Sequence, residues 1–155
     1  MQSLIKTQRL PIPLEEAWNF FSDPRNLAKI TPAKMNFRIT SDLGDGKTYP
    51  GMIITYKVSP LFGIPMTWVT EITQVREREF FIDNQLYGPY KFWHHQHIFK
   101  EVPGGVEMTD ILHYAAPLGF IGSFMERMFI KRKVEAIFSY REKVLTEYFP
   151  GIARG

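Results

Sequence analysis

The sequence of 155 residues contains no cysteine. This absence excludes disulfide bridges, zinc fingers, metal sites with thiolate ligands and a cysteine nucleophile, and it is compatible with a reducing compartment. No apolar stretch approaches the roughly 18 residues that a membrane span requires, and residues 1–16 lack the basic start and long apolar run of a signal peptide. We therefore expect a cytoplasmic protein without a transmembrane segment.

The net charge is also small, at +3, and the one dense basic cluster is IKRK at residues 130–133. Nucleic-acid-binding proteins present a larger basic surface, so we expect no nucleic-acid partner. Hydrophobic and aromatic residues, at 45% and 15% of the composition, predict an ordered domain with either a bulky core or a lined cavity. The length favours a single domain, which we place at residues 1–150, followed by a disordered tail at 151–155.

Two short helices are expected near the N-terminus, after a first strand at residues 4–10. Apolar residues recur at helical spacing over residues 14–22, with Pro13 near the start. Asp23 is typical of an N-cap and Pro24 of a first helical residue, which predicts a second short helix ending at Ile30.

The middle of the chain consists of short β-rich runs separated by Gly, Pro and Asp, and a long helix follows it. Hairpin-length connections favour an antiparallel meander, because parallel neighbours need crossovers of about a dozen residues or more. After residues 117–119, a segment rich in helix formers reaches Phe149 and predicts the one long helix. The predicted strands are 36–41, 52–58, 66–75, 80–87, 91–100 and 106–115.

These elements predict an α+β fold in which a curved antiparallel sheet buries one face against the long helix. A single helix cannot fill a strongly curved sheet. The remaining space is either packed by aromatic side chains or forms a pocket, and the pattern alone leaves both possibilities open.

The segment KFWHHQH at residues 91–97 contains three of the four histidines. Side chains alternate between the two faces of a strand, so Trp93, His95, His97 and Phe99 share one face, and His94 lies on the other. Only two of the three histidines can therefore act together.

The segment VPGG between the last two predicted strands sets the expected register. With a loop of two or four residues, positions whose numbers sum to 207 are opposite each other, which pairs His97 with Asp110 and His95 with Leu112. A loop of three residues would break this register. In the expected register, the Asp110 carboxylate accepts a hydrogen bond from an imidazole and fixes its tautomer.

Arg141 lies near the centre of the broad apolar sector of the long helix. A guanidinium in that position needs an acidic partner or a ligand, unless its side chain extends to solvent. The other residues of the sector are Ile130, Val134, Ile137, Phe138, Val144, Leu145 and Tyr148.

The first half of this helix and the loop PLFGIP at residues 60–65 both carry apolar side chains. They could meet as the lip of a pocket, formed by Leu61, Phe62, Phe124 and Met128. The alternative is ordinary packing of the loop against the helix.

Several chemistries can be weighed for the histidine pair. His95, His97 and Asp110 could form a metal-binding set, but the carboxylate is expected to orient an imidazole and no further ligand is evident, so we expect no metal and no other cofactor. A structural histidine pair is the simpler interpretation. No serine elbow or carboxylate pair is present, so we assign no catalytic residue, although acid–base chemistry by either histidine stays open.

The chain resembles the ligand-binding SRPBCC group of the START and pollen-allergen-like superfamily, which includes relatives of the polyketide cyclases and dehydrases. The segments that carry the resemblance are LEEAWNFFSDPRNLAKITP, GIPMTWVTEI, GPYKFWHHQHIF, MTDILHYAAPLG and EAIFSYRE. It implies a helix-grip fold, with a curved seven-stranded antiparallel sheet around the long C-terminal helix, two short helices after the first strand, and a hydrophobic cavity.

The resemblance also implies a set of inward-facing residues. The recurrent pattern of the group falls on Trp93, His95, His97, Phe99, Asp110 and Arg141, and Tyr114 shares the inward face of Asp110. We expect these seven residues to be ligand-binding. Members of the group range from lipid carriers to cyclases, so the fold does not select a reaction.

Our leading hypothesis is a protein without firm catalytic features that binds a mostly hydrophobic small molecule, lipid-like or polycyclic, between sheet and helix. The alternative is a cyclase or dehydratase that uses an imidazole in the same cavity as acid or base. A third hypothesis is a protein-interaction module. We expect a monomer or a weak homodimer.

Overall fold

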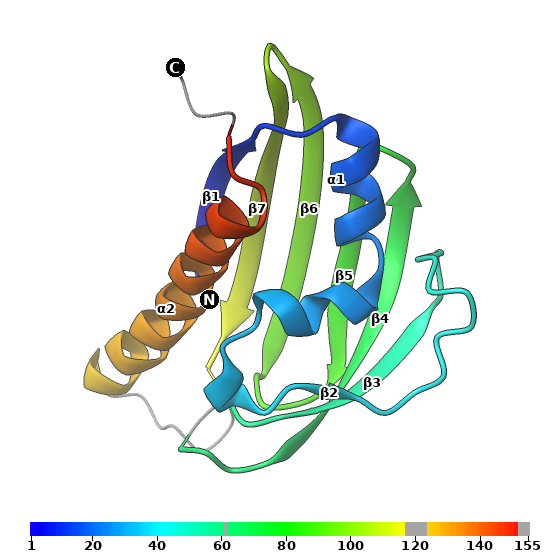
Figure 1. The fold of residues 1–155 in the computed structure, drawn as a ribbon. Helices are drawn as coiled ribbons and strands as arrows, with labels where there is room; N and C mark the ends of the chain where they lie inside the picture. The colour runs from blue at the N-terminus through cyan, green and yellow to red at the C-terminus, as the bar shows by residue number, and fades with distance from the viewer. Residues whose placement is uncertain (61, 117–123, 152–155) are drawn as a thin grey trace.

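A computed structural model describes residues 1–60, 62–116 and 124–151, and for residues 124–127 it describes the backbone alone. One antiparallel sheet curves around the long helix α2, while α1 and the short 3-10 helix η1 cover the other end of its concave face (Figure 1). The elements are β1 (Gln2–Leu10), α1 (Leu14–Phe21), η1 (Pro24–Ile30), η2 (Ala33–Met35), β2 (Arg38–Ile39), β3 (Ile53–Val58), β4 (Met66–Arg76), β5 (Phe80–Tyr87), β6 (Phe92–Val102), β7 (Gly105–Ala115) and α2 (Phe124–Tyr148).

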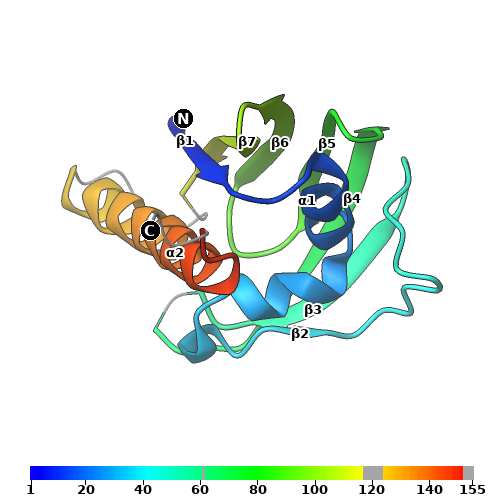
Figure 2. The same ribbon diagram turned by 45° about the horizontal axis from the view of Figure 1, so that its top comes forward.

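The sheet has seven strands in the order β1-β7-β6-β5-β4-β3-β2, so the first strand pairs with the last and the others form a meander. Figure 2 shows α2 lying inside the curve of the sheet. The predicted α+β helix-grip architecture is therefore confirmed. Within the described ranges, no helix combines the length and the apolar character that a membrane crossing requires.

The β6–β7 hairpin has the register that the sequence predicted. Val102 pairs with Gly105 across a two-residue loop, which places His97 opposite Asp110 and His95 opposite Leu112. A Cβ atom on Gly105 would lie 2.0 Å from the carbonyl oxygen of Leu10, so glycine is required where the hairpin meets the end of β1. The hairpin thus fixes the relative position of the histidines and the aspartate.

Strand β2 is shorter than predicted, with only Arg38–Ile39 instead of residues 36–41. Asn36 has a left-handed backbone (φ 49°) where it ends η2, so the strand cannot begin there. At the other end, the amides of Thr40 and Ser41 both donate to the carbonyl of Thr55, which interrupts the ladder. The predicted second short helix is present as η1. The carboxylate of Asp23 accepts a hydrogen bond from the amide of Arg25 and caps this helix, as predicted.

Helix α2 turns Ile130, Val134, Phe138, Arg141 and Leu145 inward, as predicted from their spacing. Tyr148 was placed in the same sector but is 49% exposed, as the last residue of the helix. Its ring packs on Phe20 and Phe149 instead. The predicted helical residues before position 124 lie outside the described residues, as do residues 152–155 of the predicted tail.

Two apolar clusters divide the interior. The first lies between β3, β4 and α2 and includes Tyr56, Trp68 and Phe138, and the second lies beneath α1 and includes Trp18 and Phe81. The histidine pair of β6 lies where they meet: the ring of His95 contacts Phe138 with centroids 5.5 Å apart, and that of His97 stacks on Phe81 at 4.1 Å.

Candidate functional site

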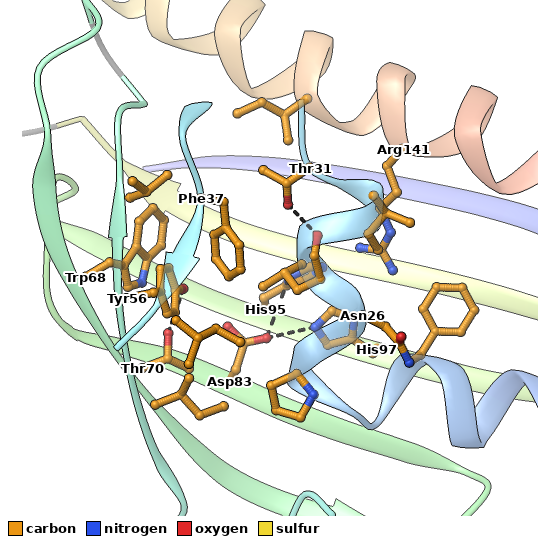
Figure 3. A pocket seen from close by; sticks show the side chains of 18 of the residues that line it. Asn26, Thr31, Phe37, Tyr56, Trp68, Thr70, Asp83, His95, His97 and Arg141 are labelled. Carbon is orange, nitrogen blue, oxygen red and sulfur yellow. Dashed lines mark hydrogen bonds and ion pairs between the residues drawn. The ribbon is translucent and has the colours of Figure 1, made fainter. Parts of the chain in front are cut away.

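A cavity of about 170 Å³ lies between the concave face of the sheet, η1 and α2. Most of its wall is apolar, with Phe37, Ile54, Trp68 and Ile72 on one side and Ile137 of α2 on the other. Figure 3 shows a small group of polar side chains gathered at one part of this wall. The space that the sequence left open as core or pocket is therefore a cavity in the described structure.

The polar group comes from four elements and is almost fully enclosed. His95 and His97 belong to β6, Asp83 to β5, Asp110 to β7 and Arg141 to α2. The side chains of His95, His97, Asp110 and Arg141 are 6–9% exposed, and that of Asp83 is 16% exposed. Charges buried to this extent require partners, because an isolated one would cost several kcal/mol.

Asp110 is the centre of one half of this polar group. Its Oδ1 lies 3.0 Å from Nε2 of His95, 3.1 Å from Nδ1 of His97 and 3.3 Å from Nη1 of Arg141. The His95 contact is a hydrogen bond, whereas Nδ1 of His97 is poorly aligned for one despite its short distance. The expected hydrogen bond between Asp110 and an imidazole is present, but it is made by His95 and not by His97 directly opposite. Of the possibilities left open for Arg141, the structure shows the acidic partner. Arg141 also donates to the sulfur of Met108 at 3.7 Å.

Asp83 is the centre of the other half of the polar group. Its Oδ2 lies 2.8 Å from Nε2 of His97 in a hydrogen bond and 3.7 Å from Nδ1 of His95 (Figure 3). The two imidazoles therefore lie between two carboxylates, with one nitrogen of each ring directed at Asp110 and the other at Asp83.

Burial and charge oppose each other at these groups. Burial alone would raise the pKa of both aspartates, but the Arg141 charge and the histidines hold the pKa of Asp110 well below its usual value, and the hydrogen bond from His97 lowers that of Asp83. Burial would also lower the pKa of His97, yet its two carboxylate partners raise it. The pKa of His95 is lowered, by burial and by the neighbouring charge of His97. These opposite directions favour protonation of His97 over protonation of His95.

The predicted ligand-binding residues divide into two groups. Trp93, His95, His97 and Arg141 line the cavity. The other three are buried but absent from its lining: the ring of Phe99 lies 5.5 Å from that of Trp18, the ring of Tyr114 lies 6.2 Å from that of Trp93, and Asp110 contacts the histidines. Their role in binding stays a prediction.

The predicted lip is only partly described. Phe62 is 69% exposed and stacks on Phe129 with centroids 5.6 Å apart, and Met128 is half-buried. Neither lines the cavity. Leu61 and the side chain of Phe124 lie outside the described residues. The contact between Phe62 and Phe129 matches the alternative interpretation, in which the loop packs against the helix.

Two polar features of the cavity were absent from the sequence interpretation. Asp83 was missed, although it shares the inward face of Phe81 and pairs with His95. A register for the hairpin joining β5 and β6 would have identified it. The second feature is a buried hydrogen bond of 3.0 Å between the hydroxyls of Tyr56 and Thr70, both in the cavity wall.

No protein-family model and no curated protein matches the chain. Several solved structures are similar to the chain. Protein Ms6760 from Mycobacterium smegmatis is 20% identical, with 94% of this chain and 92% of that chain covered and a TM-score of 0.65. Ara h 8.0201 is 12% identical, with coverage of 94% and 98% and a TM-score of 0.61. DynU16, from the dynemicin biosynthetic locus, is 14% identical, with a TM-score of 0.59, and the chain spans 49% of its length.

Identities this low establish a shared fold and leave ligand and reaction open. Three observations agree with the resemblance drawn from the sequence. They are the seven-stranded sheet, the long C-terminal helix and the solved structures that match nearly the whole chain. The chain has the SRPBCC or Bet v1-like helix-grip fold.

Proposed function

We propose that the chain binds a mostly hydrophobic small molecule in the cavity between the sheet and α2. The observation that carries this proposal is the arrangement of the wall, which is mostly apolar and contains one enclosed cluster of charged side chains. Small-molecule sites are commonly built in this way, because apolar contacts supply affinity while a few polar groups fix orientation.

The cavity volume bounds the ligand. A cavity of about 150 Å³ is enough for a benzene molecule, so the 170 Å³ found here fits a single ring or a short alkyl segment. A larger lipid-like or polycyclic ligand would require the walls to move apart. The aromatic side chains of Phe37, Trp68 and Trp93 offer flat contact surfaces for such a molecule.

The charges of the polar group also restrict the chemistry of the ligand's polar end. Asp110 already neutralises Arg141, and the carboxylate of Asp83 lines the cavity. The Asp83 carboxylate can only accept hydrogen bonds, so it offers none to an anionic head group, whereas a hydroxyl or amide could donate one to it. We expect the ligand to carry a neutral hydrogen-bond donor at its polar end.

Native mass spectrometry of the purified protein, with organic extraction of any bound molecule, tests the proposal. We expect one neutral, largely apolar molecule per chain. Calorimetric titration of 4-ethylphenol, ethylbenzene and 4-ethylbenzoate then tests the polar end, and the phenol should bind about tenfold more tightly than ethylbenzene, which corresponds to one net hydrogen bond. Tighter binding of the benzoate would contradict the role given to Asp83.

An enzyme of the cyclase or dehydratase type is a second candidate, favoured by the position of His97. Its raised pKa favours the protonated imidazole, and both His97 and its hydrogen-bonded partner Asp83 line the cavity, so His97 could act as a general acid. Extracts of the wild type and the His97→Gln variant should then contain different molecules, product and unreacted precursor. Identical molecules in both extracts would exclude this candidate.

A further inference from the structure

The cavity-facing side of the histidine pair has the composition and spacing of a metal site. Asp83, His95 and His97 each offer one ligand atom within 4.8 Å of the others. Metal–ligand distances of about 2.0–2.2 Å place neighbouring donor atoms in a tetrahedral site roughly 3.3–3.6 Å apart. The separations of 2.8 Å from Asp83 Oδ2 to His97 Nε2 and 3.7 Å to His95 Nδ1 lie on either side of that range.

The opposite side of the pair supplies the support that metal-bound histidines usually have. A ligating imidazole commonly donates its second N–H to a carboxylate, which fixes the tautomer and the ring orientation. Nε2 of His95 is hydrogen-bonded to Asp110, so its Nδ1 presents a lone pair toward Asp83. Nδ1 of His97 lies 3.1 Å from the same Asp110 oxygen without an aligned hydrogen bond, and its Nε2 is directed at Asp83.

The charges are also arranged favourably. Arg141 contacts Asp110, on the far side of the imidazoles from Asp83, and so holds the supporting carboxylate without occupying the donor atoms. In the described structure a proton joins His97 Nε2 to Asp83 Oδ2 across 2.8 Å, because a carboxylate oxygen cannot otherwise lie so close to an imidazole lone pair. A cation could replace that proton.

We propose that Asp83 Oδ2, His95 Nδ1 and His97 Nε2 bind one divalent transition-metal ion, with Zn²⁺ as the reference ion. Two imidazoles and one carboxylate suit borderline ions such as Zn²⁺, and three protein ligands leave a position open. All three residues line the cavity, so that position faces the space where a small molecule would bind. The site does not depend on the small-molecule proposal, since the ion binds with the cavity otherwise empty.

The sequence interpretation expected no metal because it treated Asp110 as the single available carboxylate. Asp83 supplies a second carboxylate from a different strand. Asp110 can therefore orient the rings while Asp83 acts as ligand, and the objection raised from the sequence no longer holds.

Titration of the chelator-treated, full-length protein with Zn²⁺ or Co²⁺ alone tests the site. We expect one equivalent of Zn²⁺ by calorimetry and, for Co²⁺, visible absorption typical of four or five ligands. On adding Zn²⁺, the ¹⁵N resonances that shift most should be those of His95 Nδ1 and His97 Nε2. Wild-type protein that binds neither ion would overturn the proposal without any variant.

Variants then locate the ion. Loss of a carboxylate that only supports a ligand costs about 10–100-fold in metal affinity, so Asp83→Asn, which removes a ligand, should weaken Zn²⁺ binding by at least about 100-fold. His94→Gln is the matched control, because His94 lies on the opposite face next to His113. Binding lost in the control and retained in Asp83→Asn would assign the ion to the outer face and overturn the proposal.

Discussion

Histidines on the two faces of β6 have different surroundings. On the outer face, Nδ1 of His94 lies 2.6 Å from the side-chain oxygen of Asn84, and its ring is next to His113. On the inner face, His95 and His97 lie between two carboxylates, with a guanidinium behind them. Enclosure, and the charges contributed by neighbouring elements, distinguish the faces. Variants on each face should therefore differ in their effect.

The largest effect is expected from Asp110→Asn on the inner face, because it leaves the Arg141 guanidinium buried without its counter-charge. Removing one partner of a buried ion pair costs about 3–5 kcal/mol of unfolding free energy. Urea unfolding followed by circular dichroism measures this loss. Adding Arg141→Met should recover much of it, and a double variant no more stable than Asp110→Asn would contradict the importance of the charge pair.

Neighbouring residues of β5 allow a direct comparison of the faces. Asp83→Leu removes a charged acceptor from His97 on the inner face and should cost about 1.5–3 kcal/mol, whereas Asn84→Leu removes a neutral partner of His94 on the outer face and should cost about 0.5–1.5 kcal/mol. The same unfolding assay gives both values. Equal losses would show that enclosure does not distinguish the two faces.

The inner histidines should shift stability in opposite directions with pH. The pKa of His97 is raised in the folded chain, so its contribution is fully present below the unfolded value of about 6.5 and is lost as pH rises through the folded pKa. The pKa of His95 is lowered, so stability is lost as pH falls below about 6.5 and this buried ring must become charged. Asp83, Asp110 and Arg141 are the charged groups that face them.

Unfolding between about pH 5 and pH 9 should therefore show the stability advantage of wild type over His97→Gln shrinking with rising pH, and that over His95→Gln growing. Each unit of pKa shift contributes about 1.4 kcal/mol. Parallel pH profiles for the two variants would contradict the opposite pKa shifts of His95 and His97.

The smallest effect is expected from His94→Gln. The glutamine keeps a hydrogen-bonding group at a half-buried position on the outer face, so the unfolding free energy should change by less than about 0.5 kcal/mol. Thermal unfolding is sufficient to detect a larger change. A loss comparable to that of Asp83→Leu would remove the distinction between the two faces.

Much of this site followed from local rules. Strand alternation separated His94 from His95 and His97, and the two-residue loop of VPGG placed His97 opposite Asp110. Helical spacing brought Arg141 to the same interior.

The remainder depends on features that local rules do not specify. From the sequence, a register was derived only for the hairpin at VPGG. The Gly88-Pro89 signal between β5 and β6 marks a turn without fixing the loop length, so the pairing that brings Asp83 to the histidines was not assigned. The left-handed Asn36 shortened β2, and the position of Tyr148 at the end of α2 exposed a residue that the helical pattern placed inside. The packing of Phe62 on Phe129 depends on the path of a loop, which residue spacing does not determine.

Calorimetric titration of 4-ethylphenol into the wild type and two tryptophan variants of α2 tests the central claim most directly. Ile137 lines the cavity, so Ile137→Trp should fill it, whereas the neighbouring Ala136 is exposed and Ala136→Trp should leave it open. We expect one molecule per chain to bind the wild type and Ala136→Trp, and none to bind Ile137→Trp. Equal binding by all three proteins, or no binding by the wild type, would contradict a ligand site between the sheet and α2.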